Sequence, residues 1–138
     1  MKTKKVVLVI TDGADETEKM AAKITAALKG NQVSVKTASD FKGNDILPAD
    51  SFFLGCEKQN PPSFAYLEDL FKHINLAGRT CGIFSPGSEK AVKYLAKLVK
   101  DCEAILSPDP GIFNEPAGRS SKSTNIEKWA QKVILKSL

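Results

Sequence analysis

Residues 6–20 read VVLVITDGADETEKM, an apolar run that passes through a short polar turn into a helical pattern. We interpret this stretch as a buried strand, a loop and a helix. In an open α/β sheet, the loop after the first strand lies at the carboxyl end of the strands, where ligands bind. The residues of this loop therefore bear on function, and they include Asp12, Asp15 and Glu16.

Four further strand patterns follow along the chain, at residues 32–38, 51–56, 80–84 and 102–106. The first of these alternates apolar and polar residues, which is typical of a strand at the edge of a sheet. Helical patterns separate the strands, and this alternation indicates parallel pairing with helices on both faces. We therefore predict a three-layer, doubly wound α/β fold with a five-stranded parallel sheet in the order 2-1-3-4-5.

Four helices are predicted from apolar residues at helical spacing and from residues that cap helix N-termini. The predicted N-caps are Asp15, Ser63, Ser88 and Thr124. We expect Phe64, on the apolar face of the second helix, and Phe84, in the fourth strand, to be packing residues. Residues 39–48 and 107–123 are polar and rich in turn formers, so we expect loops there.

The overall composition indicates a single globular domain over residues 1–138, with 42% apolar and 26% charged residues. The net charge is +4, but the lysines are spread along the helices without interleaved aromatic residues, so no nucleic-acid partner is expected. The apolar run from Val6 to Ile10 is too short for a signal peptide or a membrane span. Cysteines at 56, 81 and 102 suggest neither a disulfide framework nor a zinc site, and we expect a cytoplasmic protein.

Several short motifs occur in the same order as in a known family. They are Thr17-Glu18-Lys19-Met20-Ala21 at the start of the first helix, Leu54-Gly55-Cys56 at the end of the third strand, Gly78 before the fourth strand, and Asn114-Glu115-Pro116 ahead of the last helix. With these motifs the chain resembles the short-chain flavodoxins from about Val6 to Ile134. The resemblance implies a flavodoxin-like fold, an FMN cofactor and electron transfer to redox protein partners.

The resemblance also implies which residues would contact a flavin. In the flavodoxins the loop after the first strand cradles the FMN phosphate, and the loops after the third and fourth strands hold the isoalloxazine ring. The corresponding residues here are Thr11, Asp12, Gly13, Ala14, Asp15, Glu16, Thr17, Cys56, Glu57, Ser85, Pro86 and Gly87. We take these residues as the candidate cofactor-binding site, and we predict no catalytic residue.

This candidate site departs from the family pattern in its charge and in its lack of aromatic residues. Asp12 stands where a hydroxyl is usual, Ala14 has lost a hydroxyl, and Asp15 replaces a glycine. An unpaired carboxylate ~5 Å from a phosphate costs roughly 3 kcal/mol at an effective dielectric constant of ~20. The two ring-binding loops, residues 57–62 and 85–88, contain no aromatic residue.

We therefore predict a degenerate flavin site without a bound cofactor, in a protein that has a binding or regulatory role. Its unknown protein partner or small ligand is expected at the carboxyl edge of the sheet. The alternative is an FMN-binding flavodoxin, which would act as an electron carrier with redox proteins as its partners.

Two further hypotheses concern polar groups at the same edge. Asp12, Asp15 and Glu16, together with Glu57, offer oxygen ligands to a cation such as Mg²⁺. Acidic residues at a helix start also interact favourably with the helix dipole, so we predict capping and no metal site. Cys56 also lies at this edge, where a thiol could be accessible to solvent and reactive, but no sequence signal places a general base beside it.

Overall fold

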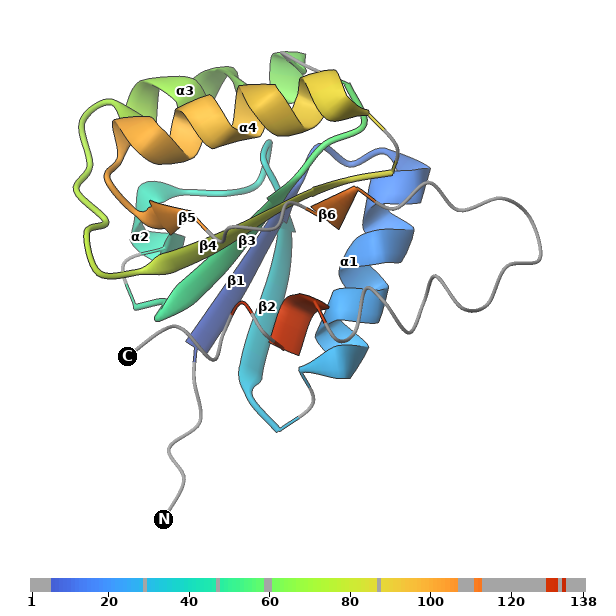
Figure 1. Ribbon diagram of the computed structural model, residues 1–138. Helices are drawn as coiled ribbons and strands as arrows, with labels where there is room; N and C mark the ends of the chain where they lie inside the picture. The colour runs from blue at the N-terminus through green and yellow to red at the C-terminus, as the bar shows by residue number, and fades with distance from the viewer. Residues whose placement is uncertain are drawn as a thin grey trace.

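The computed structural model describes residues 6–28, 30–46, 48–58, 61–86, 88–106, 111–112, 129–131 and 133. Within these residues the chain forms three layers (Figure 1). A central sheet is covered by helices α3 (Ala65–Phe71) and α4 (Glu89–Asp101) on one face and by helix α1 (Asp15–Ala27) on the other. This arrangement confirms the predicted α/β class with helices on both faces.

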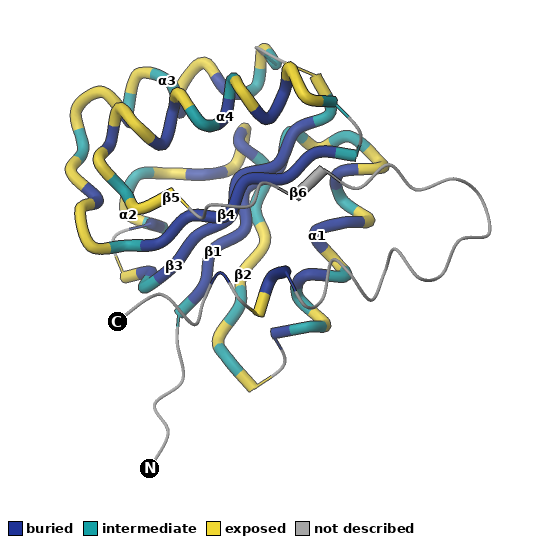
Figure 2. The backbone as a smooth tube through the Cα atoms, in the orientation of Figure 1, coloured by how far each residue is buried: buried dark blue, intermediate teal, exposed yellow. Residues whose placement is uncertain are grey.

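The sheet follows the predicted order. Its strands are β1 (Val6–Thr11), β2 (Gln32–Thr37), β3 (Ser51–Gly55), β4 (Thr80–Ser85) and β5 (Ile105–Leu106). They are arranged β2-β1-β3-β4-β5, and every neighbouring pair is parallel. Figure 2 shows β3 and β4 buried throughout and β2 partly exposed at the edge, as its alternating pattern predicted.

A short additional strand lies in the segment 107–123, which the sequence predicted to be a loop. This strand, β6 (Gly111–Ile112), pairs in parallel with Phe84 and Ser85 at the end of β4. β5 pairs only with Thr80 and Cys81, so the rest of the β4 edge is available to β6. A two-residue strand is too short to produce a periodic pattern, which is why the prediction missed it.

The last predicted strand also starts later than expected. Residues 102–104 were assigned to it, but α4 extends to Asp101 and Cys102 is its C-cap. Glu103 then takes a left-handed backbone conformation, with φ of 65°, and β5 begins at Ile105. Residues 102–104 therefore form the turn that ends α4 and are not part of the strand.

Three of the four predicted N-caps lie among the described residues, and the structure confirms one of them. At the start of α4, the Ala91 N–H donates to Oγ of Ser88 at 3.1 Å, which confirms Ser88 as the cap. The prediction for Asp15 is wrong, because Asp15 is already the first residue of α1 and Ala14 occupies the N-cap position. The predicted cap Thr124 lies outside the described residues.

The segments before α3 also differ from the prediction. Ser63 does not cap α3 but lies inside a 3₁₀ turn, η1 (Pro62–Phe64), that runs directly into the helix. Pro62 causes this shift, because its fixed φ favours the first position of a helical turn. The predicted loop 39–48 contains one helical turn, α2 (Gly43–Ile46).

Two hydrophobic clusters fill the space between the layers. Phe64 belongs to the cluster beneath α3 and α4, and Phe84 belongs to the cluster beneath α1. Both rings are inaccessible to solvent, which confirms their predicted packing role. Trp129, from the predicted last helix, packs edge-on against Phe53 and Phe84 with ring centroids 5.4 and 6.3 Å apart.

Gly55 makes close packing possible at the end of β3. A Cβ atom built at this position would lie 2.2 Å from two atoms of the Phe84 ring. The ring therefore lies directly against the backbone of Gly55, one residue before the loop that contains the candidate site residues Cys56 and Glu57.

Candidate functional site

The register of the sheet brings three of the candidate loops to the same level. Thr11 is opposite Gly55, and Gly55 is opposite Phe84, so the loops after β1, β3 and β4 leave the sheet side by side. This is the carboxyl edge, as predicted, and most of the candidate site residues that the structure describes lie along it. Gly87 is outside the described residues.

The carboxylate of Asp12 connects two of these loops. Its Oδ1 accepts the N–H of Ala14 at 3.0 Å, within the loop after β1. Its Oδ2 accepts the N–H of Glu57 at 2.7 Å, from the loop after β3. Hydrogen bonds to an ionised group are stronger than neutral ones, so Asp12 holds the two loops together.

Thr11 organises the same loop from its buried side. Its hydroxyl donates to the carboxylate of Glu18 in α1 and accepts the N–H of Gly13 at 3.2 Å. Gly13 has a φ of 83°, a conformation that favours glycine, so the chain turns sharply here before α1. The amides of Gly13 and Ala14 are thus both bonded to side chains of the protein itself.

Thr17 and the remaining acids occupy the first turn of α1. The Thr17 side chain is inaccessible to solvent, and its hydroxyl has no hydrogen-bond partner within the described part of the chain. Asp15 and Glu16 are exposed, and Glu16 forms an ion pair with Lys19 at 3.2 Å. These acids lie near the positive end of the helix dipole, where their charge is favourable.

The acidic residues do not gather around a common point. In the described segments, no group of three Asp, Glu, His or Cys side chains is arranged to hold a metal ion. Both oxygens of Asp12 accept backbone N–H groups, and Asp15 and Glu16 point into solvent on the helix surface.

Cys56 is buried, in contrast to the hypothesis of an accessible thiol. Its side chain has 0% exposure and packs in the cluster beneath α3 and α4. Burial raises the pKa of the Cys56 thiol to about 12, and the negative charge of Asp12 adds to this effect. The thiol is therefore neutral and shielded at ordinary pH, so the hypothesis of an accessible thiol is wrong.

Ser85 and Pro86 form the edge after β4. Ser85 is buried, and its Oγ accepts the N–H of Ser88 at 3.3 Å, just before α4. Pro86 is half-buried. The described part of this turn thus contains one hydroxyl, which already accepts a hydrogen bond from the protein, and no aromatic ring.

No protein-family model and no curated protein matches the sequence of this chain. Solved structures do match. A short-chain flavodoxin associated with a bacterial microcompartment has a TM-score of 0.83 at 13% identity, over 99% of this chain and 100% of its own. Flavodoxin 2 from Bacillus cereus has a TM-score of 0.83 at 17% identity, over 96% of this chain and 99% of its own.

A third match is a mutant flavodoxin from Fusobacterium nucleatum bound to flavin mononucleotide, with a TM-score of 0.77 at 10% identity, over 98% of both chains. The chain has the flavodoxin-like fold. This conclusion agrees with the resemblance found in the sequence and with the strand order β2-β1-β3-β4-β5.

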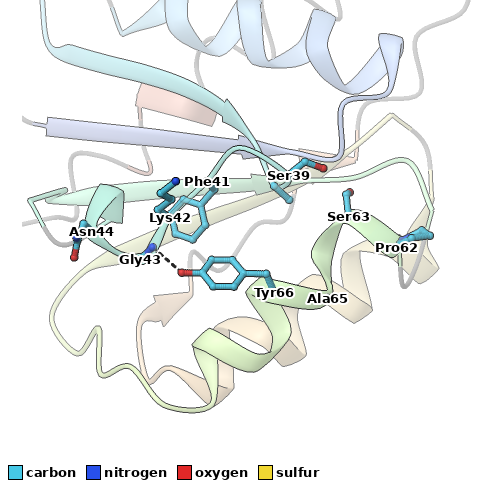
Figure 3. A pocket seen from close by; sticks show the side chains of 10 residues that line it. Ser39, Phe41, Lys42, Gly43, Asn44, Pro62, Ser63, Ala65 and Tyr66 are labelled. Atoms are coloured by element: carbon cyan, nitrogen blue, oxygen red, sulfur yellow. Dashed lines mark hydrogen bonds between the residues drawn. The ribbon is translucent and has the colours of Figure 1, made fainter.

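The sequence did not predict a cleft that lies beside the candidate cofactor-binding site. It has a volume of about 770 Å³ and lies between the segment after β2 and the start of α3 (Figure 3). The lining residues are Ala38, Ser39, Phe41, Lys42, Gly43, Asn44, Pro62, Ser63, Ala65 and Tyr66. The available signal was Tyr66, an aromatic residue at a solvent-facing position between the buried Phe64 and Leu67.

Among the described residues, no helix has the length and apolar content needed to span a membrane.

Proposed function

We propose that this chain is a flavodoxin-like binding or regulatory protein with a degenerate flavin site, in which no cofactor supports redox chemistry. The observation that carries this proposal is the position of the Asp12 carboxylate, which accepts the amides of Ala14 and Glu57. A bound anion would need such donors, and here the protein supplies the anion itself. We also propose that residues 1–138 form one cytoplasmic domain.

The charge of the loop argues against a phosphate for the same reason. A phosphate that approached the loop amides would have to displace Asp12 or lie close to it. At ~5 Å and an effective dielectric constant of ~20, this repulsion costs roughly 3 kcal/mol. A nanomolar site is worth only about 12 kcal/mol in total, so one such contact removes a large share of the affinity.

The ring-binding loops support the same proposal. Residues 57–62 and 85–88 contain no aromatic side chain, and the nearby Phe64 and Phe84 are held in the core. An isoalloxazine ring at this edge would lack the stacking partners that contribute about 0.5–1.5 kcal/mol each beyond area burial. The residues present therefore do not suit FMN.

A second candidate function is FMN-dependent electron transfer with redox proteins as partners. The buried hydroxyl of Thr17, in the first turn of α1, has no partner among the described residues, and a phosphate oxygen could accept from it. The flavodoxin of Fusobacterium nucleatum, which has the same fold, binds FMN. In this alternative the chain would carry electrons, and the flavin would supply the redox chemistry.

An FMN titration followed by flavin fluorescence separates the two functions. We expect the unaltered protein to leave micromolar FMN fluorescent, since a stacking pocket would quench it. A variant with Asp12→Ser, Ala14→Thr and Asp15→Gly removes the acids and restores a hydroxyl. It should gain a modest affinity for FMN or inorganic phosphate, because no aromatic walls are restored.

The matched control carries Asp69→Ser and Asp101→Ser, which remove the same two charges from exposed positions on α3 and α4. This control should gain nothing if the effect is local to the loop. Tight, quenching binding of FMN by the unaltered protein would overturn the proposal and establish the electron carrier instead.

A further inference from the structure

The cleft between residues 38–44 and 62–66 lies beside the candidate cofactor-binding site, and only Pro62, at the end of the ring-binding loop 57–62, belongs to both. It begins at the carboxyl end of β2 and runs along the start of α3 (Figure 3). Its volume of about 770 Å³ lies within the range of small-molecule sites.

The polar lining of the cleft is suited to an anionic ligand. Lys42 is the only charged residue among the described residues that line it, although the chain contains sixteen acids. Figure 3 shows Ser39 and Ser63 toward one end of the cleft and Lys42 toward the other. Two acids flank Lys42 in sequence, and neither lines the cleft: Asp40 is exposed, and Oδ2 of Asp45 accepts the backbone N–H of Lys42 at 2.8 Å. A single cation in the lining complements a ligand that carries a single negative charge.

Tyr66 gives the cleft a flat apolar wall. Its side chain is 47% exposed, which makes it one of four large hydrophobic residues that are exposed in the described part of the chain. Two contacts hold the ring in place: the hydroxyl accepts the N–H of Gly43 at 2.9 Å, and the ring packs at a tilt against Phe41, 6.1 Å between centroids. A ring held in this way is ready to stack with a second planar ring at little cost in side-chain entropy.

From these contacts we propose that the cleft binds a small planar aromatic acid, with its ring against Tyr66 and its carboxylate toward Lys42. This proposal goes beyond the function proposed above and does not depend on whether the chain binds FMN. It defines the ligand by two separable properties, a flat ring and one negative charge.

The test titrates the full-length protein with 2-naphthoate and follows backbone amide resonances by NMR. The neutral analogue 2-naphthalenemethanol tests the charge, and cyclohexanecarboxylate tests the ring. We expect saturable shifts from 2-naphthoate at Gly43 and Ser63, and weaker binding of both analogues. Lys42→Gln should weaken the binding of 2-naphthoate roughly threefold and leave the affinity for the neutral alcohol unchanged. Tyr66→Leu should weaken the binding of both naphthyl compounds roughly fivefold.

Lys90→Gln, at an exposed position on α4, is the matched control for Lys42→Gln and should not change the affinity. Three results would overturn the proposal: no saturable shift at millimolar 2-naphthoate, shifts confined to the Asp12 loop, or equal binding of the acid and the alcohol. Because the Asp12 loop is unaltered in these variants, the outcome is independent of the FMN titration.

Discussion

The loop around Asp12 and the cleft beside Tyr66 lie at the same edge of one sheet, but they differ in whether their polar side chains are hydrogen-bonded within the protein. In the loop, the carboxylate of Asp12 and the hydroxyl of Thr11 are bonded to the protein itself. In the cleft, the side chains of Lys42 and Ser63 face open space. The polar groups of the first region bond within the protein and those of the second are open to another molecule, so two neighbouring places at one sheet edge can differ in what they offer a ligand.

The largest expected effect comes from the same substitution made in both regions. Gly55→Ala would place a Cβ 2.2 Å from the Phe84 ring, and overpacking of this severity should lower the free energy of unfolding by about 3 kcal/mol. At Gly43, the nearest atoms to an added Cβ are 3.4 Å away, so Gly43→Ala should change stability by less than about 1 kcal/mol. Urea denaturation of both variants measures the difference. Equal effects would show that the closed region is no more tightly packed than the open one.

Removing the carboxylate that joins the loops should have the next largest effect. Asp12→Ala leaves the amides of Ala14 and Glu57 without their charged acceptor, and we expect a loss of about 2–3 kcal/mol. Asp15→Ala, at an exposed position in the same turn, should stay within about 0.5 kcal/mol. Thermal unfolding monitored by circular dichroism compares the two. A similar loss in both variants would mean that Asp12 contributes only as a charge near the helix start.

The buried thiol predicts a dependence of stability on alkaline pH. The pKa of Cys56 rises from 9.0 to about 12 in the folded protein, so the unfolded chain releases this proton first as the pH increases. Stability is therefore retained below pH 9 and falls between about pH 9 and 12. Denaturation at pH 7, 8.5 and 10 should show this fall, and Cys56→Ala should reduce it. An unchanged pH profile in that variant would contradict a buried, neutral Cys56.

Labelling with a thiol reagent sharpens the same point. At pH 8 the native protein should react slowly at Cys56, because the thiol is buried and protonated. If Asp12 keeps the loop closed over this residue, Asp12→Ala should accelerate the labelling of Cys56, located by peptide mass spectrometry. Rapid labelling of the native protein would mean that the loop opens readily.

The cleft should respond more weakly to the loss of its internal hydrogen bond. Tyr66→Phe keeps the ring and removes the acceptor of the Gly43 N–H, which should cost about 0.5–1.5 kcal/mol. Chemical denaturation measures this cost, and amide hydrogen exchange at Gly43 should accelerate in the same variant. If both quantities stay unchanged, the bond does not connect the two walls of the cleft in solution.

The smallest expected effect is that of Mg²⁺ on the acidic turn. Because Asp12 is engaged by two amides and the described acids form no cluster of three, Mg²⁺ should leave the melting temperature unchanged at matched ionic strength. The double variant Asp12→Asn, Asp15→Asn provides the comparison. A rise in melting temperature that the double variant abolishes would establish a cation site.

The fold was predictable from the sequence because its signals are long and mutually consistent. The apolar run of β1 and the alternation of β2 specify a central and an edge strand, and Ser88 lies at the right spacing to cap α4. The errors concern short segments, where the pattern for one element overlaps with that for another or extends over too few residues. Pro62 starts a turn that takes Ser63 away from the predicted cap position, and β6 has only two residues.

The candidate site was less predictable for a different reason. The positions of Thr11 to Thr17 followed from the strand and helix patterns, but the role of Asp12 depends on the amide of Glu57, a residue forty-five positions away. A backbone amide carries no signal in the sequence. Cys56 was misjudged because one residue of chain separates the buried end of β3 from its exposed loop, and periodicity cannot resolve such a boundary.

Trp129 provides an optical consequence of this architecture. It is the only tryptophan of the chain, it is 8% exposed, and it packs against Phe53 and Phe84 on the α1 face. Tyr66 and its cleft belong to the opposite face, with α3. Tryptophan emission should therefore be blue-shifted in the folded state and indifferent to a ligand beside Tyr66, so that a single intrinsic fluorophore reports the integrity of one face while binding is followed on the other.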